Sequence, residues 1–293
     1  MLRSRTTTPD HAHDDHGDHG DHGDHDRGLQ FDLSTLVNRR RSLALLGGAG
    51  LVSLAACLPE GSSDSTTTTT SASGGGATTT TGSGTSCSAI PEETAGPYPG
   101  DGSNGVNVLS QSGVVRSDIR SSFGSSTTTA TGSAFEIVLK VLDTSNSCNP
   151  LVGAAVYLWH ANIDGKYSMY SQGVTNENYL RGVQETDSNG EVHFTSIFPG
   201  CYDGRWPHLH FEVYPSVAKA VAAGNKLRTS QMAMPQDVCQ QVYATSGYSQ
   251  SITNLSRVSL KTDNVFSDGY SLQLGTMTGS VGDDLRATLA VPV

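Results

Sequence analysis

The sequence predicts a mainly β protein, an antiparallel β-sandwich core with short helices and long loops. Short segments rich in β-branched and aromatic residues recur from residue 134 to the C-terminus, and several alternate apolar with polar positions. The connections between them are rich in Gly and Ser, and helical patterns are few and weak. Many short strands joined by such turns are typical of a sandwich.

The first strand is the clearest element. In segment 134–143, Phe135, Ile137, Leu139 and Val141 recur at every second position, which is the period of a half-buried strand. Five further strands and two short helices are expected, the strands at 154–161, 191–198, 208–214, 269–279 and 285–293, and the helices at 216–224 and 235–246.

The chain is expected to divide into three regions. Residues 1–56 combine a His/Asp-rich segment with a signal peptide. Residues 57–86 are a cysteine followed mainly by Gly, Ser and Thr, the composition of a flexible tether. Residues 87–293 are long enough for one domain with a proper core, so any catalytic site is expected there.

An export signal is expected at residues 38–57, NRRRSLALLGGAGLVSLAAC. Its apolar run is too short for a membrane span and fits a signal-peptide core, while RRRSL resembles a twin-arginine signal. LAAC resembles a bacterial lipobox, in which Cys57 would carry lipid. A plain signal peptide or a short anchor is the alternative. We expect an exported, extracytoplasmic lipoprotein that contacts the membrane only through the lipid on Cys57.

Charge and cysteine usage narrow the function classes further. The chain has a net charge of −10 and no basic patch, so nucleic acid is not an expected partner. Apart from Cys57, four cysteines remain, an even number that predicts two disulfides in an exported protein but leaves the pairing open: Cys87, Cys148, Cys201 and Cys239. No CxxC spacing occurs, so a thiolate metal site is not expected.

Two histidines form the first candidate metal-ligating pair. His208 and His210 are two residues apart in a predicted strand, so both imidazoles should project from the same face. That spacing suits two neighbouring ligands on one metal, but a row of polar residues facing solvent would have the same spacing. The His-rich tract at 11–28 would be lost on cleavage before Cys57, and its role stays open.

The loop before these histidines favours a metal site. Tyr202 and Arg205 lie in PGCYDGR, which leads directly into the histidine strand. Two neutral imidazoles with anionic phenolates suit trivalent iron, because anionic ligands stabilise Fe(III). A second phenolate is then required, and Tyr167, in a Gly-containing turn, is the candidate, with Tyr170 as a competitor.

Several motifs together resemble the intradiol ring-cleavage dioxygenases, the family of catechol 1,2- and protocatechuate 3,4-dioxygenases. They are PEETAGPYPGD, WHANIDGKYS, RGVQETDSNGEVHFTSIFPGCY and GRWPHLHFEV, and with MPQDVCQQVY and DNVFSDGYSLQL the resemblance covers about 87–280. The resemblance implies a ferric site held by four residues, Tyr167, Tyr202, His208 and His210.

The resemblance also implies the other members of the site. Tyr202 would be the tyrosinate that leaves the metal when substrate binds, and Arg205 would stabilise charge on the substrate ring. Tyr98 would line the substrate pocket, and Gln184 would lie near it. The implied substrates are O2 and a catechol or hydroxyquinol, cleaved to a cis,cis-muconate-type diacid. Only Asp203 and Gly204 separate Tyr202 from Arg205, fewer residues than in well-known members, so the particular catechol stays open.

Two other interpretations compete with this one. The pattern GAAVYLW, then TDSNG, then PGCY is also typical of transthyretin-like and carboxypeptidase-regulatory-like sandwich modules, which would bind without catalysis. A hydrolase on the same scaffold is the third option. The tyrosine and histidine set discriminates between them, because a binding module has no reason to keep it together. The oligomeric state stays open, with a homodimer among the options.

Overall fold

A computed structural model describes residues 87–293, and the signal segment, Cys57 and the tether lie outside the described residues. The protein is mainly β, as predicted, with two sheets. The first sheet is centred on β1, which pairs with β2, β5 and β9, and β8 continues beyond β9. Its strands are β1 (Ala134–Asp143), β2 (Asn149–Pro150), β5 (Glu191–Ile197), β8 (Thr276–Ser280) and β9 (Asp283–Pro292).

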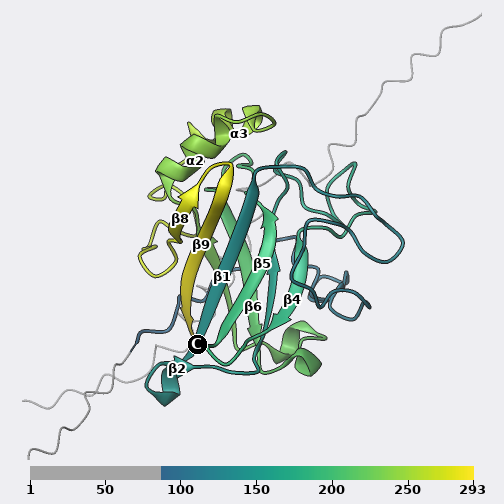
Figure 1. Ribbon diagram of the computed structural model, residues 1–293, viewed down its shortest axis with the longest axis vertical. Helices are drawn as coiled ribbons and strands as arrows, with labels where there is room; N and C mark the ends of the chain where they lie inside the picture. Colours follow the sequence, from purple (N-terminus) through teal and green to yellow (C-terminus); the bar gives the residue numbers. More distant parts are fainter. Residues whose placement is uncertain (1–86) are drawn as a thin grey trace, which may run out of the picture.

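The second sheet carries the residues of interest and lies behind the first in Figure 1. Its order is β4-β3-β6-β7, and every pair is antiparallel. The strands are β3 (Ala155–Trp159), β4 (Arg181–Glu185), β6 (His208–Tyr214) and β7 (Arg228–Ala233). In the first sheet one pair departs from the antiparallel prediction, because β1 and β9 run parallel.

Helical structure is sparse and gathers mostly at one end of the sandwich. Two helices, α2 (Gln236–Tyr243) and α3 (Ser249–Leu255), lie together beside one end of the sheets (Figure 1). The helix expected at 216–224 is wrong: the chain there forms only two 3-10 turns, η3 (Val217–Lys219) and η4 (Ala223–Asn225), and a third turn, η2 (Thr144–Asn146), follows β1. No helix in residues 87–293 has the length and hydrophobicity that a membrane span requires.

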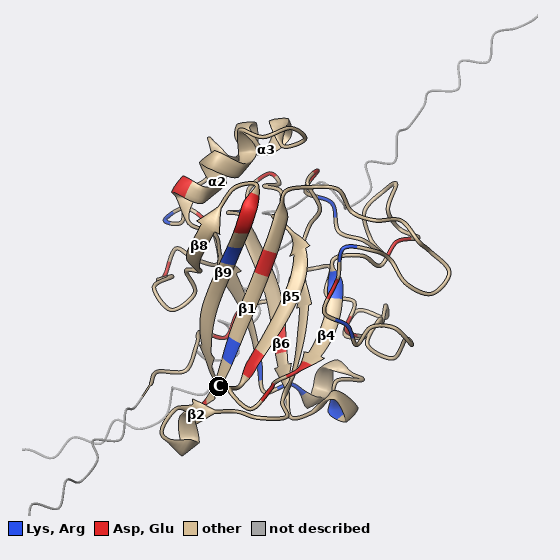
Figure 2. Cartoon of the chain, viewed as in Figure 1, with Lys and Arg blue, Asp and Glu red and all other residues tan. Residues whose placement is uncertain are grey.

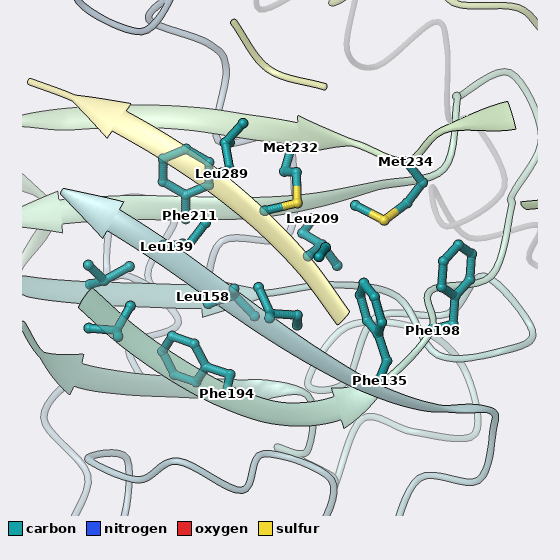
Figure 3. Close-up of a cluster of buried hydrophobic side chains, with 14 of the residues drawn as sticks. Phe135, Leu139, Leu158, Phe194, Phe198, Leu209, Phe211, Met232, Met234 and Leu289 are labelled. Carbon is teal, nitrogen blue, oxygen red and sulfur yellow. The ribbon is translucent and has the colours of Figure 1, made fainter. Parts of the chain in front are cut away.

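The main core lies between the two sheets. Apolar side chains of β1 and β5 meet those of β3, β6 and β7, and the aromatic rings in this layer include Phe135, Phe194 and Phe211 (Figure 3). The outer face of the first sheet carries charges of both signs (Figure 2), such as the exposed ion pair between Arg286 and Glu136. The first sheet is therefore half-buried, as the alternation in β1 predicts.

The second sheet is buried on both faces, and this determines where the site lies. All seven residues of β6 are buried. Leu209, Phe211 and Val213 face the main core, while the alternate residues His208, His210, Glu212 and Tyr214 face the other side. A second apolar cluster covers that side, and it contains Trp159 of β3 together with residues of the loops around Val108 and Tyr167.

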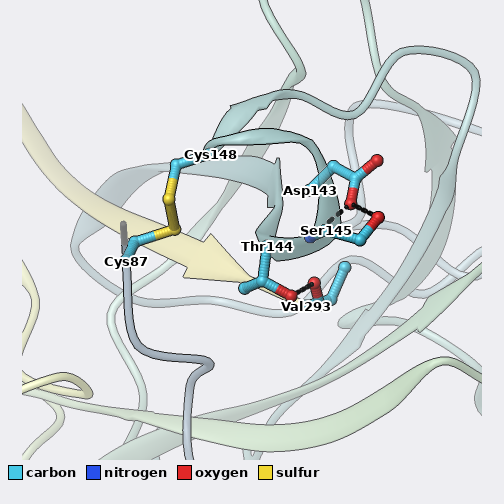
Figure 4. Close-up of a disulfide and its surroundings, with 6 residues drawn as sticks. All are labelled: Cys87, Asp143, Thr144, Ser145, Cys148 and Val293. Atoms are coloured by element: carbon cyan, nitrogen blue, oxygen red, sulfur yellow. Dashed lines mark hydrogen bonds between the residues drawn. A yellow bond between two sulfur atoms is a disulfide. The ribbon is translucent and has the colours of Figure 1, made fainter. Parts of the chain in front are cut away.

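One of the two predicted disulfides is present. Cys87 and Cys148 are bonded, which ties the start of the described chain to the turn after β1 (Figure 4). Cys201 and Cys239 are free, so the prediction of a second disulfide is wrong. Both thiols are buried in the main core, and burial raises the pKa of Cys201 to about 12 and that of Cys239 well above its ordinary value. Disulfide formation proceeds through the thiolate, which this environment disfavours.

Replacing Cys87 and Cys148 together with serine is expected to destabilise the domain. The bond closes a loop with a sequence separation of 61 residues, and its loss should lower the free energy of unfolding by about 4 kcal/mol through loop entropy. Urea unfolding of the variant and of the oxidised and reduced parent measures this difference. Equal free energies for the oxidised and reduced parent would contradict it.

Candidate functional site

The β6 strand places both histidines in the buried outer layer. His208 and His210 alternate with Leu209 and Phe211, so their rings leave the sheet on the face opposite the main core. His210 pairs in register with Trp159 of β3, and the two rings stack with centroids 4.9 Å apart and planes 8° apart. The flanking strands β3 and β7 thus fix the orientation of the histidine pair.

A tight turn after β3 presents Tyr167. Asn162 organises the turn, because its side-chain oxygen accepts hydrogen bonds from the backbone N–H groups of Asp164 (3.0 Å) and Lys166 (2.9 Å). The next turn is closed by the Tyr167 backbone, whose N–H donates to the Ser171 hydroxyl at 3.0 Å. The ring of Tyr167 is buried, with 3% of the residue exposed.

A second turn presents Tyr202 and packs directly on the first. Gly200 approaches the carbonyls of the first turn so closely that an added Cβ would lie 2.5 Å from Ile163 O. Gly165 approaches Tyr202 in the same way, since its Cβ would lie 2.6 Å from the Cβ of Tyr202. The two tyrosine-bearing turns are therefore in contact only because glycine occupies both positions.

Four donor atoms converge in this layer. The Nε2 atom of His208 lies 3.4 Å from Tyr167 Oη, 3.3 Å from Tyr202 Oη and 3.0 Å from His210 Nε2. The described residues contain no group of three or more His, Cys, Asp or Glu side chains placed for a metal, and this cluster instead combines two imidazoles with two phenols. Tyr170, the competitor of Tyr167, bonds elsewhere: its hydroxyl donates to Asn104 and accepts from the Gly100 N–H.

Both histidines are held neutral. Burial lowers the pKa of His208 to about 3, with the positive charge of Arg205 acting in the same direction, and burial together with His208 and Arg205 lowers that of His210 well below its ordinary value. The Nδ1–H of His208 donates to Trp206 O at 2.5 Å, so its Nε2 carries a lone pair that points into the cluster. The Nδ1 atom of His210 is buried without a hydrogen-bond partner.

The donor set fits a metal ion. Two ligands about 2.1 Å from one metal lie about 3 Å apart when their bonds are at right angles, which matches the separations around His208 Nε2. Neutral imidazoles and ionisable phenols are a harder donor set than thiolates and suit ferric iron. The residues that could hold the metal are Tyr167, Tyr202, His208 and His210.

Arg205 lies beside the cluster in a buried network that the sequence did not predict. Its Nε donates to Asp263 at 3.0 Å and its Nη2 donates to Gln231 at 2.7 Å. Asp263 also accepts the backbone N–H groups of Trp206 and Val265. Burial alone would raise the pKa of Asp263, but Arg205 and these donors hold it below its ordinary value.

Sequence signals for Gln231 and Asp263 are weak. Gln231 pairs in register with His210, yet nothing in the polar segment RTSQMA predicted β7. Asp263 precedes Asn264 in a turn-like stretch, and nothing there assigned it to the site. Both residues are completely buried, and their partners are distant in the chain.

The remaining two expected residues lie in different places. The ring centroids of Tyr98 and Tyr167 are 5.2 Å apart, so the segment 91–101, called the entry segment below, contacts the cluster. The structure does not bring Gln184 to the cluster. Gln184, on β4, pairs in register with Val156 of β3. Its side chain donates a hydrogen bond to the His193 carbonyl of β5 and leaves β4 on the face opposite to that of Arg181. His193, with 59% of its side chain exposed, is also outside the cluster.

Comparison with known proteins shows which proteins share this fold and part of this sequence. The family model described as Dioxygenase matches residues 124–208. An intradiol ring-cleavage dioxygenase from Tetranychus urticae superposes with a TM-score of 0.55 at 26% identity, covering 70% of this chain and 94% of that one. In this segment and in its fold, the chain is similar to intradiol ring-cleavage dioxygenases.

A characterised relative gives a shorter match. A chlorocatechol 1,2-dioxygenase from Rhodococcus opacus is 36% identical over 63 residues, which are 22% of this chain and 24% of that enzyme. The match therefore spans about a quarter of the length of that relative. Intradiol dioxygenases are known to use iron, and the donor set described above fits that metal.

Replacing Gly165 with alanine is expected to disturb the site beyond its effect on the backbone. Gly165 has a φ of +75°, so alanine there costs about 1 kcal/mol of strain, and its Cβ would displace Tyr202. Gly153→Ala is the matched control, because its φ is +78° and no atom lies within 4 Å of the added Cβ. Both variants carry the backbone strain, but only Gly165→Ala adds the clash, so it should lose more stability than Gly153→Ala and alone should bind iron more weakly in an equilibrium titration. Equal iron affinity in the two variants would contradict the claim that the close approach of Gly165 to Tyr202 positions the site.

Proposed function

We propose that residues 87–293 form a ferric intradiol dioxygenase. The enzyme would cleave a catechol-type ring between its two hydroxyl-bearing carbons. Both atoms of O2 would enter the product, a cis,cis-muconate-type diacid, so that catechol and O2 together account for all of its atoms. The observation that carries the proposal is that two phenol oxygens and His210 Nε2 lie 3.0–3.4 Å from His208 Nε2.

Four residues would hold the iron, namely Tyr167, Tyr202, His208 and His210. When bound, the iron supplies a Lewis acid and a template for the two catechol oxygens. The chain favours the ferric state, because two phenolates bring negative charge and the histidines are kept neutral by burial. The Trp206 carbonyl fixes the tautomer of His208 that leaves Nε2 bare, and Trp159 holds the plane of His210.

Tyr202 is the ligand best placed to exchange protons with a substrate. It is partly exposed, whereas the other three residues of the cluster are buried. A catechol must lose its hydroxyl protons as it binds, and Tyr202 Oη is a phenolate acceptor at the open side of the cluster. Tyr202 would therefore be the acceptor of a substrate proton, while the buried Tyr167 would stay in place.

Arg205 would stabilise negative charge that develops on the substrate ring. Its guanidinium is completely buried, and Asp263 and Gln231 fix its direction, so it needs little reorganisation during the reaction. Tyr98 would line the ring of the substrate beside Tyr167. These assignments support a catechol or hydroxyquinol class of substrate, and the short Asp203–Gly204 link leaves the ring substituents open.

Oxygen consumption tests the proposal. Iron-loaded protein should consume one O2 per catechol cleaved in a panel of catechols and hydroxyquinols. With labelled O2, both labelled atoms should appear in the diacid product by mass spectrometry. Absence of O2 uptake with every member of the panel, in protein that holds iron, would refute the proposed activity and favour a noncatalytic sandwich module.

We also propose that the protein is an exported lipoprotein. The support is the sequence of residues 38–57 and the Cys87–Cys148 disulfide, which is typical of an oxidising compartment. Mass spectrometry of the mature N-terminus should show a lipid-modified Cys57. A mature chain that begins elsewhere and carries no lipid would contradict this.

A further inference from the structure

Arg181, at the start of β4, is buried in the same layer as the candidate iron ligands. Only 1% of the residue is exposed, and it pairs in register with Trp159. Its guanidinium makes five hydrogen bonds, and all five partners are neutral. Nε donates to Ser168 Oγ (3.0 Å), Nη1 to Pro99 O (2.9 Å) and Tyr157 Oη (2.9 Å), and Nη2 to Tyr98 O (3.0 Å) and Ser168 O (3.0 Å).

These bonds use all five N–H donors of the guanidinium. A buried cation without a carboxylate partner is costly to keep, so full satisfaction of its donors is what makes it tolerable. Lysine could not replace it, because an ammonium has three donors and no planar fork. The position therefore requires the shape of arginine as well as its charge.

Four of the five partner atoms of Arg181 belong to two segments that form the site. Ser168 directly follows Tyr167, and its hydroxyl donates to Tyr179 O at 2.7 Å, so its oxygen is oriented to accept from Arg181. Tyr98 and Pro99 belong to the entry segment, whose Tyr98 ring lies against Tyr167. One guanidinium thus joins the backbone beside a candidate iron ligand to the backbone of a candidate substrate-lining residue.

A third connection runs through aromatic rings. The Tyr157 hydroxyl accepts from Arg181 and donates to Pro99 O at 2.7 Å. The Tyr157 ring stacks on Trp159 at 4.9 Å, and Trp159 in turn stacks on His210. Arg181 therefore supports the residues that orient His210 as well as those beside Tyr167.

The entry segment is shaped around this guanidinium. An added Cβ at Gly100, where φ is +65°, would lie 3.0 Å from Arg181 Nη1. The Gly100 N–H donates to Tyr170 Oη at 2.8 Å, and Arg181 lies over the Tyr170 ring at 5.4 Å from its centroid. Residues 98–100 are thereby held from two sides, by Arg181 and by Tyr170.

We propose that Arg181 is a positioning residue that sets the distance between Tyr98 and Tyr167, and hence the width of the space for the substrate ring. The proposal rests on the function proposed above. All five donors of Arg181 are taken by groups of the chain, so its loss should act through placement. Misplacement of binding groups by about 1 Å can cost a factor on the order of 100.

The test compares Arg181→Lys with Arg116→Lys. Arg116 donates to the backbone carbonyls of Ser121, Asn178 and Arg181 and lies over Phe123. None of these partners belongs to the entry segment or to the turn that carries Tyr167. In the iron-free proteins, hydrogen exchange should be faster in peptides covering 96–101 and 167–171 of Arg181→Lys. The same peptides of Arg116→Lys should match the parent.

The iron-loaded proteins give the second measurement. Arg181→Lys should keep its iron, with KM for catechol raised on the order of tenfold and kcat changed less. Arg116→Lys should keep the parent KM even where its Tm falls. Parent-like exchange in both segments of Arg181→Lys, or equal effects of the two variants, would overturn the proposal. A parent protein without iron or O2 uptake would instead refute the proposed function, and the exchange result would still decide the role of Arg181.

Discussion

Replacing His208 with alanine is expected to abolish iron binding, from about one iron per chain to near zero. His208 Nε2 lies within 3.4 Å of each of the other three donor atoms, so its removal takes a neutral nitrogen ligand from the middle of the set. Tyr167→Phe should have nearly as large an effect, because it removes one phenolate oxygen and keeps the ring that packs on Tyr98. Metal analysis of the purified, iron-loaded proteins measures both effects.

His193→Ala is the control for these variants. His193 lies on β5 with 59% of its side chain exposed, away from the cluster. It should bind iron and retain activity like the parent protein. Loss of iron in His193→Ala, or full iron content in His208→Ala, would show that the ligand assignment is wrong.

Replacing Asp263 with alanine is expected to cause the largest loss of stability. Asp263 and Arg205 form an ion pair whose side chains are both 0% exposed, so the variant leaves a buried guanidinium without its counter-charge. The expected loss in the free energy of unfolding is about 3–5 kcal/mol. Glu136→Ala is the control, because its pair with Arg286 is 48% exposed on each side, and it should cost about 0–1 kcal/mol. Urea unfolding of both variants measures this contrast, and similar losses would contradict it.

The buried ion pair between Arg205 and Asp263 also predicts that the free energy of unfolding depends on pH. The folded protein holds the pKa of Asp263 below its ordinary value, so the stabilisation is fully present above the pKa of the unfolded chain, about 3.9. It is lost as the pH falls through the folded pKa. Asp263→Asn keeps a hydrogen-bond acceptor and removes the charge, and its stability should therefore fall less steeply below about pH 4.

The elements and residues with a local signal were predicted well. The segment 134–143 coincides with β1, and 208–214 coincides with β6. Alternation along β6 is enough to place His208 and His210 on one face, and Tyr202 is only a short loop away. For Tyr167 the residues alone left Tyr170 as a rival, and only the family resemblance separated them.

Buried polar residues with distant partners were not predictable in this way. Neither β4 nor β7 was expected, because RGVQE and RTSQMA mix polar with apolar residues, although β7 is almost completely buried. Arg181 bonds to residues up to 83 positions away, and Arg205 to a residue 58 positions away. The parallel pairing of β9 with β1 is likewise set by topology, which a local period of two does not encode.

The visible absorption spectrum tests the central claim most directly. Folded protein loaded with Fe(III) should be red-brown, because tyrosinate ligands transfer charge to ferric iron. The band should weaken strongly in Tyr167→Phe and stay unchanged in His193→Ala. Folded parent protein that remains colourless after loading with Fe(III) would contradict a ferric site built from Tyr167, Tyr202, His208 and His210.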